Sequence, residues 1–320
     1  MASVSSPITH AQLDGGAIQA RYAFILGAIR RRLREMVSLR TLGAVRYAGN
    51  VGGTGSDTIR ETFYDGIGWG ASMASTAETG TTSLSSVTVE IEDIAVGRYS
   101  LGFSESYQSR ILGRPGEINV ELLAQLIPNS WEATWMDLVA TTLAAAAADF
   151  GTSGVDMSFD DYLDAIFYYR TLDGFMFSVD GRPNLFAMLH GQQLVDLATS
   201  VKAEPNYQFP EPTDAQLAGR GPGYQMSWLG AELYQSNRIT SSGGNRHGGF
   251  FGGGSIGWIN AGLDQLQVEN PQTAIIVPEL GLVTEFRGVP ADAKLQMYSN
   301  TWIGMAIQDD SQVRGMVTDA

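Results

Sequence analysis

The chain has 320 residues, of which 44% are hydrophobic, so it is long and apolar enough to bury a packed core. It contains no cysteine, which excludes disulfides, a thiolate nucleophile and cysteine-bound metals. The formal net charge of −14 argues against a general nucleic-acid binder, because such proteins need clustered lysine and arginine.

The first 50 residues differ from the rest in charge. They hold seven arginines against two acids, a net charge of +5, which leaves −19 on the remainder. Residues 16–40 predict an amphipathic helix, since apolar residues recur there at steps of three and four. Its polar face carries Arg30, Arg31, Arg32 and Arg34. These arginines indicate either a solvated helix face or a contact with a polyanion or a partner subunit.

The next region predicts a projecting hairpin. Residues 58–64 and 86–92 alternate between apolar and polar, as strands do. The stretch between them is rich in glycine, serine and threonine, and its few bulky residues include Ile67, Trp69 and Met73. Because so few bulky side chains cannot form a core, we expect an extended hairpin that needs a partner to cover it.

Helices and strands then follow without regular alternation, which predicts an α+β fold. Residues 116–150 predict a long helix, with a kink at Pro128 or a new helix beginning at Pro128 or Asn129. Residues 158–170 predict a helix capped by Ser158. Residues 184–190 predict a buried strand, followed by a helix over 191–201. Further strands are expected at 231–239, 274–280, 281–288, 295–300 and 302–309.

The glycine-rich stretch 248–262 matches two motifs of enzymes. It fits G-x-G-x-x-G of dinucleotide-binding turns and, around Ser255, G-x-S-x-G of hydrolases. The preceding residues are polar and glycine-broken rather than strand-like, and no histidine follows His247 to complete the usual triad order. We therefore interpret the stretch as flexible or closely approached backbone, with Phe250, Phe251 and Trp258 as packing anchors.

No other residues point to catalysis or to a cofactor. The histidines His10, His190 and His247 lack the spacing of metal ligands, so they are interpreted as structural or solvent-facing. The chain begins without a secretory signal, and no apolar run reaches the roughly 20 residues that cross a bilayer. These patterns predict a soluble protein made in a cytoplasm.

The order of elements resembles the major capsid protein of tailed bacteriophages, which has the Hong Kong 97-type fold. "SSVTVEIEDIAVGRYSLGFSE" resembles the returning strand of the family's extended loop, and "WEATWMDLVATTLAAAA" its long spine helix. "NLFAMLHGQQLVDLAT" resembles the strand and helix of the axial domain, and "WLGAELYQSNRI" a strand turn that recurs there.

The resemblance implies an α+β capsid fold divided into five consecutive parts. These are an N-terminal arm (1–50), an extended loop (51–106), a peripheral domain with the spine helix (107–155), an axial domain (156–285) and C-terminal strands returning to the peripheral domain (286–320). The implied contacts between subunits, or with the inner face of the shell, involve Arg30, Arg31, Arg32, Arg34, Ile67, Trp69, Met73, Phe250, Phe251 and Trp258.

The implied function is that of a structural subunit, not an enzyme. It would assemble into hexamers and pentamers of an icosahedral head in the host bacterial cytoplasm, enclosing double-stranded DNA through weak non-specific contacts. Its partners would be further copies of itself, a scaffolding protein, a portal and a decoration protein, with no membrane and no cofactor. Three alternatives stay open: an encapsulin-like compartment, a serine hydrolase using Ser255, and a phage tail or decoration protein.

Overall fold

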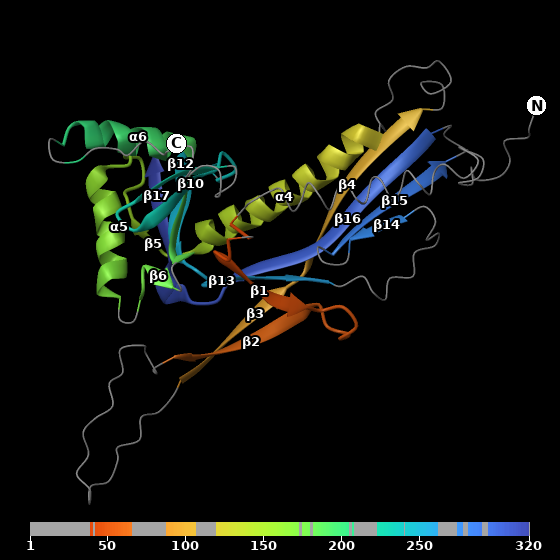
Figure 1. Cartoon of the computed structure of the whole chain (residues 1–320), viewed down its shortest axis with the longest axis horizontal. Coiled ribbons are helices and arrows are strands. Elements are labelled where there is room, and N and C mark those ends of the chain that lie inside the picture. Colours follow the sequence, from red (N-terminus) through yellow and green to blue (C-terminus); the bar gives the residue numbers. More distant parts are fainter. Residues whose placement is uncertain are drawn as a thin grey trace, which may run out of the picture.

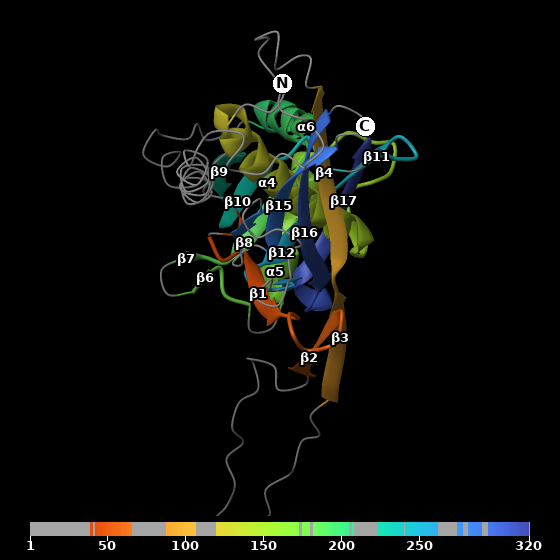
Figure 2. The same cartoon turned by 90° about the vertical axis from the view of Figure 1, so that its right-hand side faces the viewer.

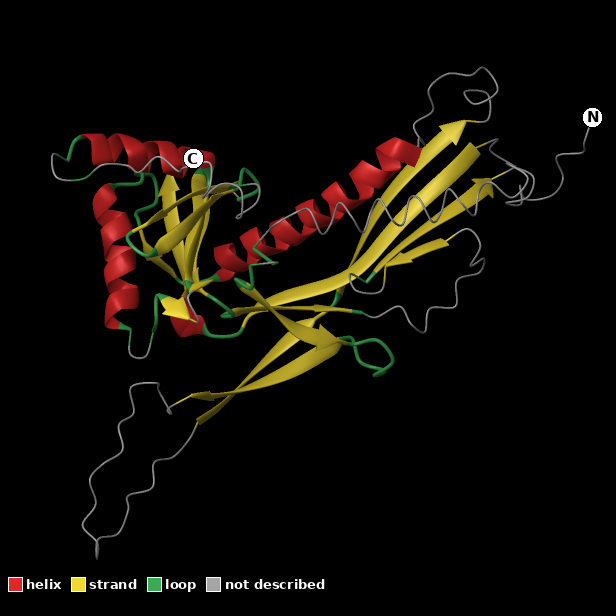
Figure 3. Ribbon diagram, in the orientation of Figure 1, coloured by secondary structure: helices red, strands yellow, loops and turns green. Residues whose placement is uncertain are grey.

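The computed structural model describes residues 39–40, 42–65, 88–106, 120–172, 175–179, 182–204, 207, 223–239, 241–261, 274–277, 281–289 and 294–319. They form two main sheets that follow each other along the long axis of the molecule (Figures 1 and 3). A long helix lies against both sheets, and a two-stranded hairpin extends away from them.

The first sheet has six strands and is built around the long strand β16. Its order is β1-β13-β16-β15-β14, and β4 also pairs with β16. The bounds are β1 Val45–Asn50, β4 Gly97–Ser106, β13 Ile256–Asn260, β14 Ala274–Val277, β15 Leu282–Val289 and β16 Lys294–Ile307. Strand β16 therefore joins into one element the two strands expected at 295–300 and 302–309.

The second sheet has seven strands, in the order β5-β17-β12-β8-β10-β9, with β11 paired to β12. The bounds are β5 Ala148–Phe150, β8 Leu185–Leu189, β9 Tyr224–Trp228, β10 Ala231–Gln235, β11 Ser241–Ser242, β12 Asn245–Gly252 and β17 Val313–Asp319. A small separate ladder joins β6 (Ser178–Val179) to β7 (Arg182–Pro183). A single 3₁₀ turn, η4 (Asp310–Gln312), precedes β17.

Helices cover both faces of the second sheet. Side chains of α5 (Phe159–Thr171) and α6 (Gly191–Lys202) pack on one face, with Leu185, Ala187 and Leu189 of β8. The intervening Phe186 and Met188 face the core shared with α4 (Val120–Ala145). This explains why the sequence of β8 is continuously apolar, since a strand covered on both faces has no side that prefers polar residues.

The expected starts of the two covering helices are confirmed. The Ser158 hydroxyl accepts a hydrogen bond from the Asp161 amide at 3.2 Å, and the Asp161 carboxylate accepts one from the Ser158 amide at 2.9 Å. This reciprocal pair satisfies two amides that the first turn of α5 would otherwise leave unpaired. His190 caps α6, and its Nδ1 accepts from the Gln192 amide at 3.1 Å.

The long helix excludes one of the two alternatives expected at Pro128 and ends earlier than expected. Helix α4 continues through Pro128, so no new helix begins at Pro128 or Asn129, while the kink stays a prediction. Buried Ile127 and Trp131 on either side hold this segment in the core, which offsets the backbone hydrogen bond that proline cannot donate. Residues 148–150 are not helical but form β5, because they pair in parallel with β17.

The two sheets do not follow the consecutive parts expected from the sequence. Strands β14 and β15 lie mostly within 156–285, yet they belong to the first sheet, where β14 pairs with β15 and β15 with β16. Strand β17 lies within 286–320, yet it joins β12 in the second sheet. The chain therefore passes between the sheets three times: through α4 between β4 and β5, at the β12–β13 turn, and between β16 and β17.

The projecting hairpin is confirmed at its base. Strand β2 (Thr58–Asp65) pairs antiparallel with β3 (Thr88–Ala95), from Thr58 opposite Ala95 to Asp65 opposite Thr88. The turned view shows both strands below the two sheets (Figure 2). The hairpin's tip, residues 66–87, lies outside the described residues.

The hairpin leaves the first sheet over a glycine of β16. A Cβ built on Gly304 would overlap the carbonyl oxygen of Ala95, where β3 passes to β4. Only glycine allows this close approach of two backbones, because the obstacle is main chain and cannot rotate away. Gly304 therefore permits the crossing from which the hairpin extends.

Replacing Gly304 by alanine should lower the free energy of unfolding by about 1–3 kcal/mol, because the added methyl group forces the crossing strands apart. Gly102→Ala is the matched control in the paired strand β4, since its Cβ would only touch the Tyr298 ring at 3.6 Å. Urea denaturation followed by circular dichroism measures both. Equal stability of the two variants would show that the crossing is not constrained at Gly304.

Candidate functional site

The glycine-rich stretch that resembles an active site is a connection between sheets. Its first part is β12 of the second sheet, and its last part is β13 of the first sheet. Strands flank the turn on both sides, whereas a dinucleotide-binding turn must open a helix. The backbone is closely approached, as expected: a Cβ on Gly253 would lie 2.6 Å from Asn184 Oδ1.

Ser255 has the geometry of a turn residue. Its hydroxyl donates to the Gly252 carbonyl oxygen at 2.7 Å, and its amide donates to the same oxygen at 3.1 Å. Only 3% of the residue is exposed, and no described side chain forms a hydrogen bond with the hydroxyl. A serine nucleophile needs a base within hydrogen-bond reach. This arrangement therefore does not support the serine hydrolase alternative.

The two described histidines lie at a helix cap and in a strand. His190 accepts the capping hydrogen bond at the start of α6, and partial burial together with nearby Arg246 lowers its pKa. His247 lies in β12, opposite Val317 of β17. Among the described residues, no three His, Asp or Glu side chains gather as metal ligands, and no helix is long and apolar enough to span a membrane.

The three aromatic residues of the glycine-rich stretch are packing anchors. Phe250 and Phe251 are fully buried, and Trp258 is 5% exposed. Phe251 stacks on Phe186 at 5.8 Å between ring centroids, while Trp258 meets the edge of Trp135 at 6.4 Å. Their assignment to contacts between subunits or to the inner face needs correction, because they are buried in the subunit's own core and leave a neighbour almost no surface.

The other candidates lie outside the described residues. These are the arm arginines Arg30, Arg31, Arg32 and Arg34, and the hairpin-tip residues Ile67, Trp69 and Met73. For the hairpin-tip residues, the nearest described feature along the chain is the base of the hairpin.

A small apolar cluster fixes the hairpin base to the first sheet. Ile94 of β3 and Ile259 of β13 are fully buried there with Val51, and Ile59 of β2 packs against them. Farther out on β3, Ile91 is 52% exposed. The described hairpin thus passes from a buried base to an exposed apolar side chain within one strand.

A carboxylate clamps the hairpin beside this cluster. Glu61 of β2 pairs with Arg46 of β1 at 3.1 Å, and its other oxygen accepts a hydrogen bond from Gln308, just after β16. Its side chain is only 13% exposed, so these contacts are partly shielded from water. One weak signal of this role is that Glu61 lies opposite Glu92 in the hairpin, because two like charges across one rung favour a compensating partner.

The chain is similar to known proteins in its fold but not in its sequence. No family profile and no curated protein matches the chain. Among solved structures, the capsid of Ralstonia phage GP4 is 9% identical over 89% of this chain and 90% of that chain, with a TM-score of 0.56. The capsid structure of the cyanophage P-SCSP1u is 11% identical over 89% and 88%, with a TM-score of 0.55.

A third similar structure is an encapsulin rather than a phage capsid. The holo-SrpI encapsulin complex from Synechococcus elongatus PCC 7942 is 12% identical over 89% of this chain and 88% of that chain, with a TM-score of 0.56. The chain therefore has the Hong Kong 97-type α+β fold that capsid proteins and encapsulins share. At these identities the likeness establishes the fold alone.

Replacing Glu61 by alanine should loosen the hairpin without unfolding the sheets. We expect a loss of about 1–2 kcal/mol of unfolding free energy, because two polar partners lose a charged acceptor at a partly shielded site. Amide hydrogen exchange in β2 and β3 should quicken. Glu92→Ala, which removes a carboxylate from the same rung, is the control and should leave exchange unchanged. Faster exchange in both variants, or in neither, would contradict the clamp.

Proposed function

We propose that this chain is the major capsid protein of a tailed bacteriophage, a subunit that assembles into the hexamers and pentamers of an icosahedral head. The observation that carries the proposal is the projecting hairpin on a Hong Kong 97-type fold. In the part of the chain that the structure describes, its two strands pair only with each other beyond the clamped base. A two-stranded hairpin is marginally stable alone, so a neighbour that covers it would supply the missing packing.

The charge distribution supports roles for the remaining parts. The N-terminal arm carries +5 and the rest of the chain −19. We assign the arm to the shell's inner face or to a neighbouring subunit, where an opposite charge would attract it. The acidic remainder would keep contacts with packaged double-stranded DNA weak. A scaffolding protein, a portal and a decoration protein complete the proposed partners.

Electron microscopy of the expressed chain tests the proposal. Closed particles of uniform diameter that protect DNA from nuclease are the expected result when the chain is produced with its phage. Closed particles that hold only protein cargo would instead indicate an encapsulin-like compartment. Tubes or isolated knobs would indicate a tail or decoration protein and overturn the proposal.

Shell assembly should depend on the hairpin tip. Deleting Gly66 to Ser83 should leave a folded, soluble subunit, because the clamp and the apolar cluster at the hairpin base stay intact. The same variant should form no shells, since neighbours would lose the surface they cover. Circular dichroism checks the fold and electron microscopy the particles. Normal particles from the deletion variant would refute this role.

The shell should be held together without covalent links. A cross-link through a lysine amine could use only Lys202 or Lys294, because the chain has no other lysine, and arginine does not lose its proton. Lys202 lies at the end of α6, far along the chain from the hairpin. Particles boiled in detergent should run as one band at the monomer mass of 34.4 kDa. A ladder of oligomers would contradict this expectation.

A further inference from the structure

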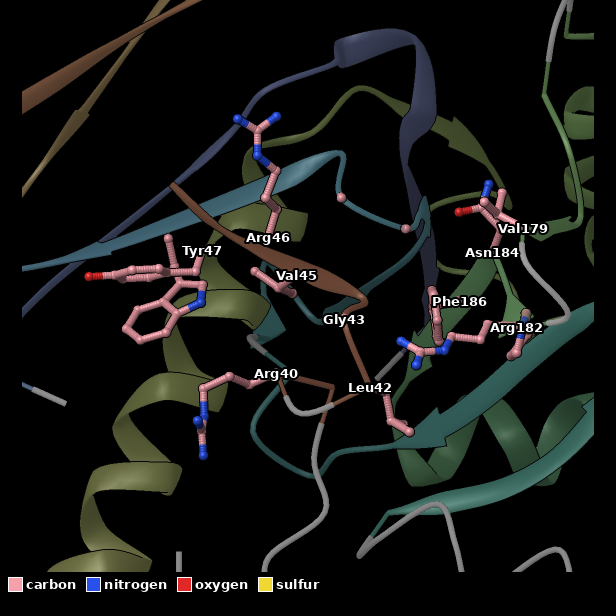
Figure 4. A pocket seen from close by; sticks show the side chains of 14 residues that line it. Arg40, Leu42, Gly43, Val45, Arg46, Tyr47, Val179, Arg182, Asn184 and Phe186 are labelled. Atoms are coloured by element: carbon pink, nitrogen blue, oxygen red, sulfur yellow. The ribbon is translucent and has the colours of Figure 1, made fainter. Parts of the chain in front are cut away.

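A positively charged hollow of about 800 Å³ opens where β1, the β6–β7 ladder and the turn between β12 and β13 meet (Figure 4). Three arginines line it, Arg40, Arg46 and Arg182, and the described residues of its lining include no aspartate or glutamate. Part of its wall is apolar, since Tyr47 is 49% exposed and Val179 is 40% exposed. The hollow thus combines cationic and apolar surface.

The charge of the hollow is only partly balanced inside the subunit. Arg46 reaches a carboxylate, that of Glu61. The Arg182 side chain is exposed and forms no ion pair or hydrogen bond within the described part of the chain. Arg40 stands over the Trp131 ring at 5.2 Å, and its buried Nε has no hydrogen-bond partner there. The unsatisfied Nε of Arg40 and the unpaired charge of Arg182 at the rim favour an anionic ligand.

Carboxylates suit this hollow better than a nucleic acid does. The arginine fork binds a carboxylate through two parallel hydrogen bonds. Nucleic-acid phosphates form an extended polyanion that is usually met by broad basic surfaces, and an acidic body repels it. The exposed rings and methyl groups of Tyr47 and Val179 add apolar surface that an apolar group beside the anion would cover. An acidic protein surface that carries an aromatic side chain meets both requirements.

The same chain has such a surface on the outer face of α5. Asp160, Asp164 and Phe167 lie one turn apart along this helix and are all exposed, Phe167 by 55%. At 1.5 Å per residue they span about 10 Å. Neither carboxylate forms an ion pair within the described residues. The helix dipole favours acidic residues in the first turn, but Asp164 lies beyond that turn, so the dipole does not explain its presence. The face is therefore also unpartnered.

We propose that the α5 face of one subunit docks in the arginine hollow of a second copy. The two surfaces are different patches of one chain, so the contact is head-to-tail, and a head-to-tail contact closes into rings when its rotation allows. The inference rests on the proposed function, because it assigns a contact within the rings of a shell. It names the side chains that select the neighbour: Asp160, Asp164 and Phe167 on one subunit, with Arg40 and Arg182 on the next.

Cross-linking between two singly labelled chains tests the contact directly. The chain has no cysteine, so Thr171→Cys at the end of the α5 face and Val179→Cys in the hollow each give one reactive thiol. A flexible bifunctional maleimide added to an equal mixture should produce a dimer at twice 34.4 kDa. Each variant alone should produce almost none, because the proposed contact brings residue 171 near residue 179 and neither near itself. Absence of the mixed dimer would overturn the proposal.

A charge exchange tests its specificity. Arg182→Glu in the Val179→Cys chain should lower the yield of the mixed dimer about tenfold, the effect of losing one well-placed ion pair. Adding Asp164→Arg to the Thr171→Cys chain should restore the yield. Lys202→Glu changes the net charge equally at an exposed site on α6 and should have no effect. Equal loss with Lys202→Glu, or failure of Asp164→Arg to restore the yield, would refute the pairing.

The outcomes separate this contact from the proposed function. Mixed dimers without closed particles in the microscope would support the contact and refute the shell. Closed particles without mixed dimers would leave the shell standing and refute the contact. If nuclease treatment were needed before Val179→Cys could react, and no mixed dimer formed, the hollow would be a nucleic-acid site instead.

Discussion

The apolar face of α4 is the constraint on which the rest of the molecule depends. Trp131 and Trp135 of this helix pack in one core with Trp258 of the first sheet and Phe251 of the second. Because neither sheet buries its inner face without α4, the two sheets and the helix form one cooperative unit although the chain passes between them three times. Under the proposed function, such a rigid body would hold the hairpin base and the hollow at constant positions relative to neighbouring copies.

Close backbone approach explains part of the high glycine content. Gly304 allows the β3–β4 crossing, and a Cβ on Gly249 would lie 2.7 Å from the Arg314 carbonyl oxygen of the neighbouring strand. These glycines lie within strands and allow neighbouring backbones to pack closely. This arrangement fixes the direction of the hairpin. The crossing at Gly304 determines where the hairpin leaves the first sheet, and Glu61 holds the base of the hairpin against that sheet.

The sequence predicts those elements that depend on neighbouring residues. The Ser158 cap, the buried strand β8 with its following helix, and the hairpin base all follow local patterns. Strand β12 does not, because glycines replace the alternating side chains where other backbones approach, and it was interpreted as a broken loop although it lies inside the second sheet. The pairing of β15 with β16 and of β17 with β12 arises from contacts distant in sequence, so consecutive boundaries could not represent the two sheets.

The arginine hollow could not be predicted from the sequence either, because it also depends on contacts between residues that are distant in sequence. Arg40, Arg46 and Arg182 are brought together only when β1 pairs with β13 and the β6–β7 ladder folds beside them. Their effect depends on range: at about 0.1 M salt, charges farther apart than roughly 10 Å are largely screened, so the overall negative charge opposes approach weakly while close pairs in a recess act fully. An acidic chain whose described surface includes a cationic recess would therefore gain from contact there and be repelled in most other orientations. Under the proposed function, this asymmetry would favour an ordered shell over disordered aggregation, because the attraction that drives association would also select its geometry.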